Sequence, residues 1–198
     1  MRTDCPWVQI NGWGSGMQYA NIKEYDIANG VGVRTSLFVS GCRHHCVECF
    51  NPEAWDFQAG KPFTPEVEEE ILASLAPDYV DGLSLLGGEP LEPENQRALA
   101  PFLERVREQY PRKSIWLWTG FVWEDLMRGE GRSLTEDLSR ILACLDVLVD
   151  GPFILGQKDL LLRFRGSSNQ RIIDVPASLA AGELVPWKDE PLFASHGW

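Results

Sequence analysis

The sequence has no apolar run long enough to cross a membrane, and its first residues, 1–6, lack the apolar segment of a signal peptide. Basic residues are also scarce, since 18 lysines and arginines stand against 29 aspartates and glutamates, for a net charge of −11. A protein that binds nucleic-acid phosphates needs a basic face, which this balance does not favour. We therefore expect a cytoplasmic protein that meets other proteins, with no membrane and no nucleic acid among its partners.

Cysteine is sparse, with five in 198 residues, and an odd number does not complete a disulfide framework. Three of the five nevertheless fall within eight residues, in the pattern Cys42-x3-Cys46-x2-Cys49. Thiols grouped in this way indicate a reducing compartment and a bound metal or cluster. Of the other two, Cys144 lies in an apolar helical stretch, which predicts a buried thiol, whereas Cys5 carries no signal.

The glycine patterns of nucleotide binding are absent as well. No Gly-x-Gly-x-x-Gly follows the first buried strand and there is no phosphate-binding loop, which argues against a Rossmann cofactor and a nucleotide hydrolase. A different pattern, Gly87-Gly88-Glu89-Pro90, follows an apolar run. The glycine pair lets the backbone approach a ligand, and the carboxylate adds an acceptor. A plain strand-to-helix turn is the alternative interpretation.

An apolar fraction of 44% indicates a folded protein, and 198 residues suffice for one domain with a sizeable core. Buried strands are expected at residues 35–40, 83–86, 115–118 and 147–149. Helices are expected to begin at 64–66, after 92–93, at 122 and at 133–136, where Ser-Leu-Thr-Glu has the form of a capping box. This alternation predicts an α/β fold of parallel strands with outer helices. The units are too few for a closed barrel, so we expect an incomplete TIM-like barrel or an open curved sheet.

The whole chain, 1–198, is expected to form a single domain. Residues 1–34 are rich in glycine and aromatics and are predicted to be extended segments joined by turns. The α/β core is expected over 35–175. The remaining segment, 176–198, contains several prolines and is expected to lie over the surface as a tail.

Four unusual segments follow the ends of the predicted strands: the cysteine loop, 87–90, Thr119-Gly120 and Asp150-Gly151. In α/β folds the carboxyl ends of the strands are where active sites are built, so these segments are expected to share one rim. Asp150 either anchors a ligand there or caps the following turn. The arginines downstream bind a partner or a carboxylate, or are ordinary surface charge: Arg163, Arg165 and Arg171.

Three thiolates on one short loop suit a [4Fe–4S] cluster whose fourth iron is left open, and an open site allows chemistry. A structural zinc with His44 or His45 as fourth ligand is an alternative, as are three unrelated thiols. Both histidines lie inside the triplet, where a tight loop makes them awkward partners for its cysteines. We expect them to line the site or to face solvent.

These segments together resemble the radical S-adenosylmethionine (SAM) superfamily. The cysteine pattern followed by Phe50-Asn51 resembles its cluster motif, and Gly87-Gly88-Glu89-Pro90 resembles its motif for the amino group of SAM. The closer resemblance is to the family of activating proteins of anaerobic ribonucleoside-triphosphate reductases. It rests on residues 29–42, 117–121, 149–153 and 165–171.

The resemblance implies that three catalytic cysteines bind three irons of a [4Fe–4S] cluster: Cys42, Cys46 and Cys49. SAM would bind the fourth iron through its amine and carboxylate, and the residues implied around SAM are Glu48, Cys49, Phe50, Gly87, Gly88, Glu89, Thr119 and Asp150. A flavodoxin- or ferredoxin-like donor would supply an electron that splits SAM into methionine and a 5′-deoxyadenosyl radical. That radical would take a hydrogen atom from a glycine of the partner, a glycyl-radical ribonucleotide reductase. A radical SAM enzyme acting on a small molecule, such as a deazapurine precursor, and a zinc-stabilised interaction module are the alternatives.

Overall fold

The computed structural model of the protein describes residues 16–129 and 131–188. In this part of the chain the strands are β1 (Gln18–Asp26), β2 (Arg34–Val39), β3 (Lys61–Pro62), β4 (Gly82–Gly87), β5 (Ser114–Trp118), β6 (Val147–Asp150) and β7 (Arg171–Asp174). The helices are α1 (Pro65–Leu75), α2 (Pro93–Gln109), α3 (Trp123–Arg128), α4 (Leu138–Cys144) and α5 (Val175–Ala181), with 3-10 turns at Pro52–Trp55 and Leu155–Gln157. None of the helices in these two ranges is long and apolar enough to span a bilayer.

The described strands form a seven-stranded sheet in the order β3-β1-β2-β4-β5-β6-β7. Its centre is parallel, because β2, β4, β5 and β6 follow one another in sequence order and in the same direction. The edges are antiparallel, through β1, β3 and β7. The α/β prediction is therefore confirmed, but the prediction of parallel strands holds only for the centre. In the described structure the 3-10 turn Leu155–Gln157 lies between β6 and β7 but no α-helix does, and β7 returns antiparallel to its neighbour.

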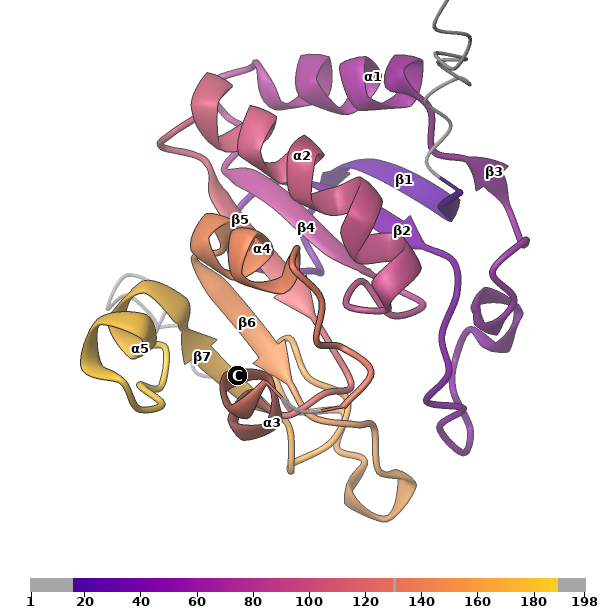
Figure 1. Ribbon diagram of the computed structural model, residues 1–198, viewed down its shortest axis with the longest axis vertical. Helices are drawn as coiled ribbons and strands as arrows, with labels where there is room; N and C mark the ends of the chain where they lie inside the picture. Colours follow the sequence, from indigo (N-terminus) through magenta and orange to yellow (C-terminus); the bar gives the residue numbers. More distant parts are fainter. Residues whose placement is uncertain (1–15, 130, 189–198) are drawn as a thin grey trace, which may run out of the picture.

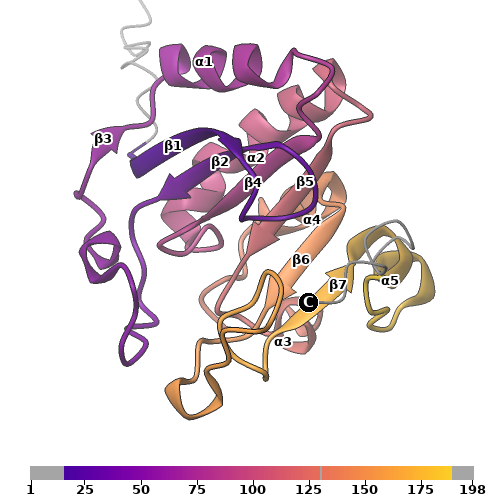
Figure 2. The same cartoon turned by 180° about the vertical axis from the view of Figure 1, so that it is seen from behind.

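The helices α2 and α4 cross in front of the central strands in Figure 1 and behind them in Figure 2, so they cover one face of the sheet. Alternation along the strands explains the two apolar clusters. Ile115 and Leu117 of β5 belong to the large cluster shared with these helices, whereas Trp116 and Trp118 belong to a smaller cluster with Phe164. The large core thus packs against one face of the strands, and loops surround the carboxyl ends of the strands.

The start of helix α4 differs from the sequence prediction. The helix begins at Leu138 with Asp137 as its N-cap residue, later in the chain than Ser133. The Thr135 hydroxyl donates to the side-chain oxygen of Gln96 in α2 (2.6 Å) and accepts from the amide of Asp137 (3.1 Å). The prediction of a capping box is therefore wrong, because its threonine is bound to a neighbouring helix and the Ser133 hydroxyl has no hydrogen-bond partner.

The part of the expected surface tail that the structure describes, 176–188, is also ordered differently. Asp174 caps α5 by accepting from the amide of Ala177 (3.0 Å), and Val175 is fully buried at the start of the helix. Pro186 then forms a bridge with Ile173 of β7. Apart from the buried Ser178, residues 176–188 are exposed or half-buried, and they begin within a helix because an aspartate followed by a first-turn proline starts one there.

The two cysteines outside the triplet are not equally placed. Cys144 at the end of α4 is 6% exposed, as predicted, and burial raises the pKa of its thiol. Cys5 lies outside the described residues. Residues 1–34 were predicted to contain turns, and one of them lies between β1 and β2, where Gly30 and Gly32 have φ of 112° and 78°.

Candidate functional site

The cysteine loop begins where β2 ends, and it lies directly against the turn that follows β4. The amide of Gly88 donates to the carbonyl of Val39 (2.7 Å), and the amide of Glu89 donates to the carbonyl of Gly41 (2.8 Å). A Cβ on Gly88 would lie 2.6 Å from the Gly41 carbonyl oxygen, which is closer than side chains approach. This position therefore needs glycine, and the two motifs singled out in the sequence are in direct backbone contact.

These two segments border a cavity of about 660 Å³ beyond the carboxyl ends of the parallel strands. It is lined by most of the residues that the sequence assigned to the site: Cys42, Cys46, Glu48, Cys49, Phe50, Gly87, Gly88, Glu89 and Thr119. Gly151 also lines it, so each of the four unusual segments contributes to the same cavity. Other lining residues carried no signal in the sequence, among them Trp55 and Lys158.

The three thiols of the loop border the cavity and none is in a disulfide. Burial raises the pKa of Cys42 to about 11 and also raises that of Cys46. Within the described ranges no group of three His, Cys, Asp or Glu side chains meets closely enough to hold a metal ion, so the sulfurs share a cavity without converging on one point. Three free soft donors beside this space fit an iron–sulfur cluster, and binding would displace protons because thiolates are the ligands.

The two histidines of the loop are engaged elsewhere. The Nε2 atom of His44 lies 2.9 Å from the Glu89 carboxylate, and its side chain is 16% exposed in the wall of the cavity. The ring of His45 stacks on Trp55, with centroids 4.6 Å apart. The expectation that they line the site or face solvent is confirmed, and this geometry gives no support to a zinc site completed by either ring.

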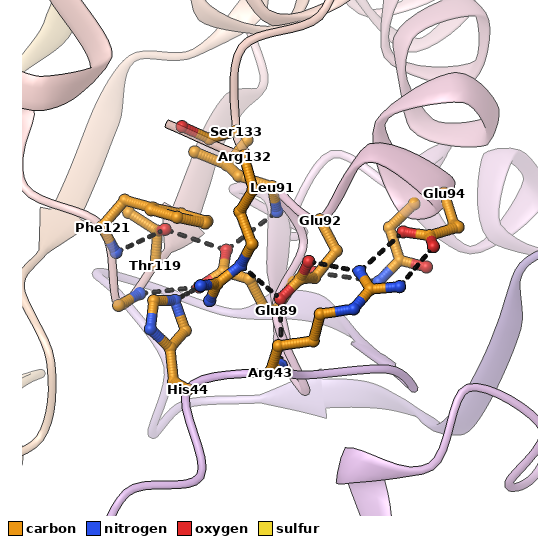
Figure 3. Close-up of polar contacts among 12 residues, drawn as sticks. Arg43, His44, Glu89, Leu91, Glu92, Glu94, Thr119, Phe121, Arg132 and Ser133 are labelled. Atoms are coloured by element: carbon orange, nitrogen blue, oxygen red, sulfur yellow. Dashed lines mark hydrogen bonds and ion pairs between the residues drawn. The ribbon is translucent and has the colours of Figure 1, made fainter. Parts of the chain in front are cut away.

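Glu89 is the centre of a hydrogen-bond network in the wall of the cavity (Figure 3). Its carboxylate is 1% exposed. One oxygen accepts from the amide of Leu91 and the hydroxyl of Thr119, both at 2.8 Å. The other accepts from the amide of Gly120 (2.7 Å) and pairs with the His44 ring. Protein donors thus occupy both oxygens, so the side chain holds three segments together and leaves the adjacent glycine backbone to face a ligand.

A second buried carboxylate, Glu92, fixes the other side of the cysteine loop. It is fully buried and accepts from the backbone amide of Arg43 (2.9 Å), from its guanidinium (2.7 Å) and from Nε of Arg132 (3.1 Å), as Figure 3 shows. The guanidinium of Arg132 lies 4.8 Å from the Phe121 ring, which in turn packs on His44. The loop is therefore clamped at two consecutive residues, Arg43 and His44. Sequence reasoning missed this clamp, because Glu92 gave only a helix-start signal.

We expect Glu92→Gln to destabilise the protein by about 1.5–3 kcal/mol, because it removes a charge that accepts from two arginines at a desolvated position. Denaturant unfolding of the anaerobically purified protein measures this change. Glu94→Gln is the matched control, since Glu94 pairs with the same Arg43 but its side chain is 46% exposed, and an exposed pair contributes about 0–1 kcal/mol. Equal losses in the two variants would contradict the clamp.

Asp150 is buried at the end of β6 but is not among the residues that line the cavity. Its carboxylate accepts from the amide of Trp123 (2.7 Å), which begins α3, and from Nε of Arg171 (3.0 Å). Arg171 also binds Glu124, and this hydrogen bond lowers the pKa of Glu124 to about 2. Asp150 thus binds the start of α3 and Arg171, and no hydrogen bond among the described residues shows its carboxylate capping the turn that follows β6. Its contact with SAM stays a prediction.

The other two arginines of this region differ from each other. Arg165 lines the cavity, and its Nη1 donates to the carbonyl of Gln170 (2.9 Å). Its Nε atom is buried without a hydrogen-bond partner, and no carboxylate of the described residues pairs with its guanidinium. Arg163 stacks over Phe164 at 4.7 Å. An unneutralised cation in the wall of the cavity favours an anionic ligand there.

Comparison with known proteins defines the class first. A family model described as a 4Fe-4S single cluster domain matches residues 28–173. This range spans the cysteine loop, the Gly-Gly turn and the loop between β6 and β7 that carries Arg163 and Arg165. The chain is thus of the single-cluster iron–sulfur class.

Three relatives define the family more closely. Anaerobic ribonucleoside-triphosphate reductase-activating protein from Pasteurella multocida is 42% identical over 159 residues, covering 79% of this chain and 96% of the relative. The proteins of that name from Escherichia coli K12 and from Enterobacteria phage T4 are 38% and 37% identical, over 78% and 79% of this chain and 96% and 93% of their own length. The protein belongs to the family of anaerobic ribonucleoside-triphosphate reductase-activating proteins.

Proposed function

We propose that this protein reductively cleaves SAM at a [4Fe–4S] cluster bound by Cys42, Cys46 and Cys49, and so generates a glycyl radical on an anaerobic ribonucleoside-triphosphate reductase. A cluster held by these three thiolates would pass one electron to bound SAM, which would release methionine and supply a 5′-deoxyadenosyl radical to take a hydrogen atom from a glycine of the reductase. The names of the relatives support the reductase as partner. The observation that carries the proposal is that the three thiols line the same cavity as the Gly87-Gly88 turn.

The residues around the cavity divide the work of binding. The backbone of Gly87 and Gly88 would present carbonyl groups to the amino group of SAM, since the amide of Gly88 already donates to the carbonyl of Val39. Thr119 and His44 hold the carboxylate of Glu89, which keeps that backbone in place. Phe50 is 83% exposed at the edge of the cavity, where it would cover a bound nucleoside from solvent.

The open sheet suits a protein substrate. Four parallel strands that add in sequence order, with helices on one face, support an interpretation as an incomplete TIM-like barrel. In the described sheet the edge strands β3 and β7 do not pair with each other, so the sheet does not close into a barrel. The open side between these two edges would allow a segment of another protein to enter. A closed barrel of this size would leave less room, since its interior is filled by side chains.

The reaction also requires an electron from outside the chain. We propose a flavodoxin- or ferredoxin-like donor, because a cluster held by thiolates can reach the low potential that a sulfonium requires, within a range of about −700 to +450 mV. We place the reaction in the cytoplasm, since a site built from free thiols needs a reducing compartment.

Arg165 is proposed to bind the carboxylate of SAM. Replacing it by glutamine is expected to weaken SAM binding about 10- to 100-fold, because a charge-assisted hydrogen bond contributes about 1.5–3 kcal/mol. Equilibrium binding of SAM to the reconstituted protein measures the effect, and the iron content should not change. Arg112→Gln, at an exposed position before β5, is the control. Unaltered SAM affinity in Arg165→Gln would remove this residue from the site.

The proposed function is tested by anaerobic incubation of the reconstituted protein with SAM and a reductant. The expected results are about four irons with matching sulfide per chain, release of 5′-deoxyadenosine, and a glycyl signal in electron paramagnetic resonance once an anaerobic reductase is added. 5′-Deoxyadenosine without any glycyl signal would indicate a small-molecule substrate instead. One zinc and no sulfide would end the proposal in favour of an interaction module.

A further inference from the structure

Large apolar side chains stand exposed on two loops at the mouth of the cavity. The three most exposed among the described residues are Leu161 (91%), Leu160 (88%) and Phe50 (83%). Phe50 and Leu160 also line the cavity itself. Leu155, in the same loop as the two leucines, is 39% exposed. Exposed leucines occur singly on most proteins, but a group of them around one opening indicates an interaction site.

The two loops that carry these side chains project from the same end of the molecule. The cysteine loop and the loop between β6 and β7 both extend beyond the carboxyl ends of the central strands, in the view of Figure 1 and in that of Figure 2. They flank the cavity, because residues of both line it. A segment that reaches the cavity from this end passes between them.

Internal hydrogen bonds hold the second loop in its shape. Lys158 forms a bridge with Ser167, and the amide of Ser168 donates to the carbonyl of Gln157 (2.8 Å). The side chain of Asn169 donates to the carbonyl of Pro152 (2.8 Å). The leucines between these points are therefore presented by an ordered loop, and their exposure is a property of the folded chain. Preorganised apolar groups of this kind bind at a low cost in conformational entropy.

We propose that Phe50, Leu155, Leu160 and Leu161 form a docking surface for the glycine-bearing segment of the reductase, an extended segment with apolar side chains on either side of its glycine. This inference rests on the proposed function, which requires the glycine of another protein to come within contact distance of a ligand in the cavity. The docking surface is continuous with that cavity through Phe50 and Leu160, which line it, so a segment that brings the glycine in from this end meets apolar side chains at the opening.

Two other occupants fit less well. A second copy of this chain on the docking surface would close the cavity against its substrate. An anionic lipid surface attracts basic proteins, whereas this chain has a net charge of −11. The apolar surface around the opening therefore favours a protein segment that is drawn in by its own apolar side chains, with little contribution from charge.

The test uses the full-length protein with reconstituted cluster and an anaerobic reductase. Leu161→Asp places a charge on the docking surface and is expected to weaken reductase binding at least about tenfold, and to lower the yield of glycyl radical at limiting protein, as a buried unpaired charge opposes association. Leu161→Met keeps an apolar side chain of similar volume and is expected to bind as the unaltered protein does. Leu179→Asp on α5 is the control, since Leu179 is 45% exposed and does not line the cavity.

Cleavage of SAM without reductase separates the possible results. Normal cleavage with weakened reductase binding in Leu161→Asp supports the docking surface. Unchanged reductase binding overturns it, and so does a change of oligomeric state as the sole effect, which would make a second copy the occupant. If the unaltered protein failed to cleave SAM, the proposed function would fail, and the docking surface would be decided by reductase binding alone.

Discussion

Replacement of Cys46 by alanine is expected to remove the cluster and to reduce SAM cleavage below detection in the same step. Among the described residues, the cysteines that line this cavity are the three of one loop. With only two of these cysteines left, a second iron of the cluster would lack its protein ligand, and the cluster would not be retained. Iron and sulfide analysis, the absorption spectrum and the yield of 5′-deoxyadenosine after anaerobic reconstitution measure the loss.

The matched control for this prediction is Cys144→Ala. Cys144 is also a free thiol, but it is buried at the end of α4 and does not line the cavity. Its loss should cost some stability through a small cavity in the core, while iron content and SAM cleavage stay close to normal. Should Cys46→Ala still cleave SAM at the normal rate, the assignment of the ligands would be wrong.

Replacement of Gly88 by alanine is expected to have the second largest effect. The added Cβ would meet two backbone oxygens, of Gly41 at 2.6 Å and of Ala54 at 2.9 Å. Backbone cannot rotate away as a side chain does, so the base of the cysteine loop must shift. We expect a loss of about 1–3 kcal/mol in the free energy of unfolding, as in overpacked interiors, together with SAM binding weakened at least about tenfold.

Denaturant unfolding and SAM titration of the reconstituted protein measure these two effects. Gly16→Ala is the control, because nothing lies within 4 Å of the Cβ it would add. Both positions lack the positive φ that would strain an alanine, so the comparison isolates the steric contact. A Gly88→Ala variant with normal stability and normal SAM affinity would contradict the prediction, because the cysteine loop could then move away from the Gly-Gly turn without loss.

Much of the central architecture could be predicted from the sequence because its signals are local. The apolar run at 83–86 lies within β4, and the threonine and proline at 64–65 mark the start of α1 as observed. Strand β7 could not be predicted in this way. It is four residues long, and its pairing with β6 depends on a loop whose course no local pattern specifies.

In the candidate site, too, local motifs could be predicted from the sequence, whereas contacts between distant parts of the chain could not. The cysteine pattern and the Gly-Gly turn are short motifs, and the structure brings them to one cavity. The partners of Glu89 and Glu92 could not be predicted, because each carboxylate is bound by residues far along the chain, such as Thr119 and Arg132. Asp150 differs from the two motifs. Its place at a strand end suggested a contact with a ligand, but its carboxylate accepts hydrogen bonds from Trp123 and Arg171.

The backbone contact between the cysteine loop and the Gly-Gly turn also limits how the site can be moved into another protein. A graft of residues 41–51 onto a foreign strand would carry the thiols but not the amides of Gly88 and Glu89 that bind the carbonyls of Val39 and Gly41. The smallest transferable unit is therefore a pair of adjacent parallel strands, β2 and β4, each with the segment that follows it.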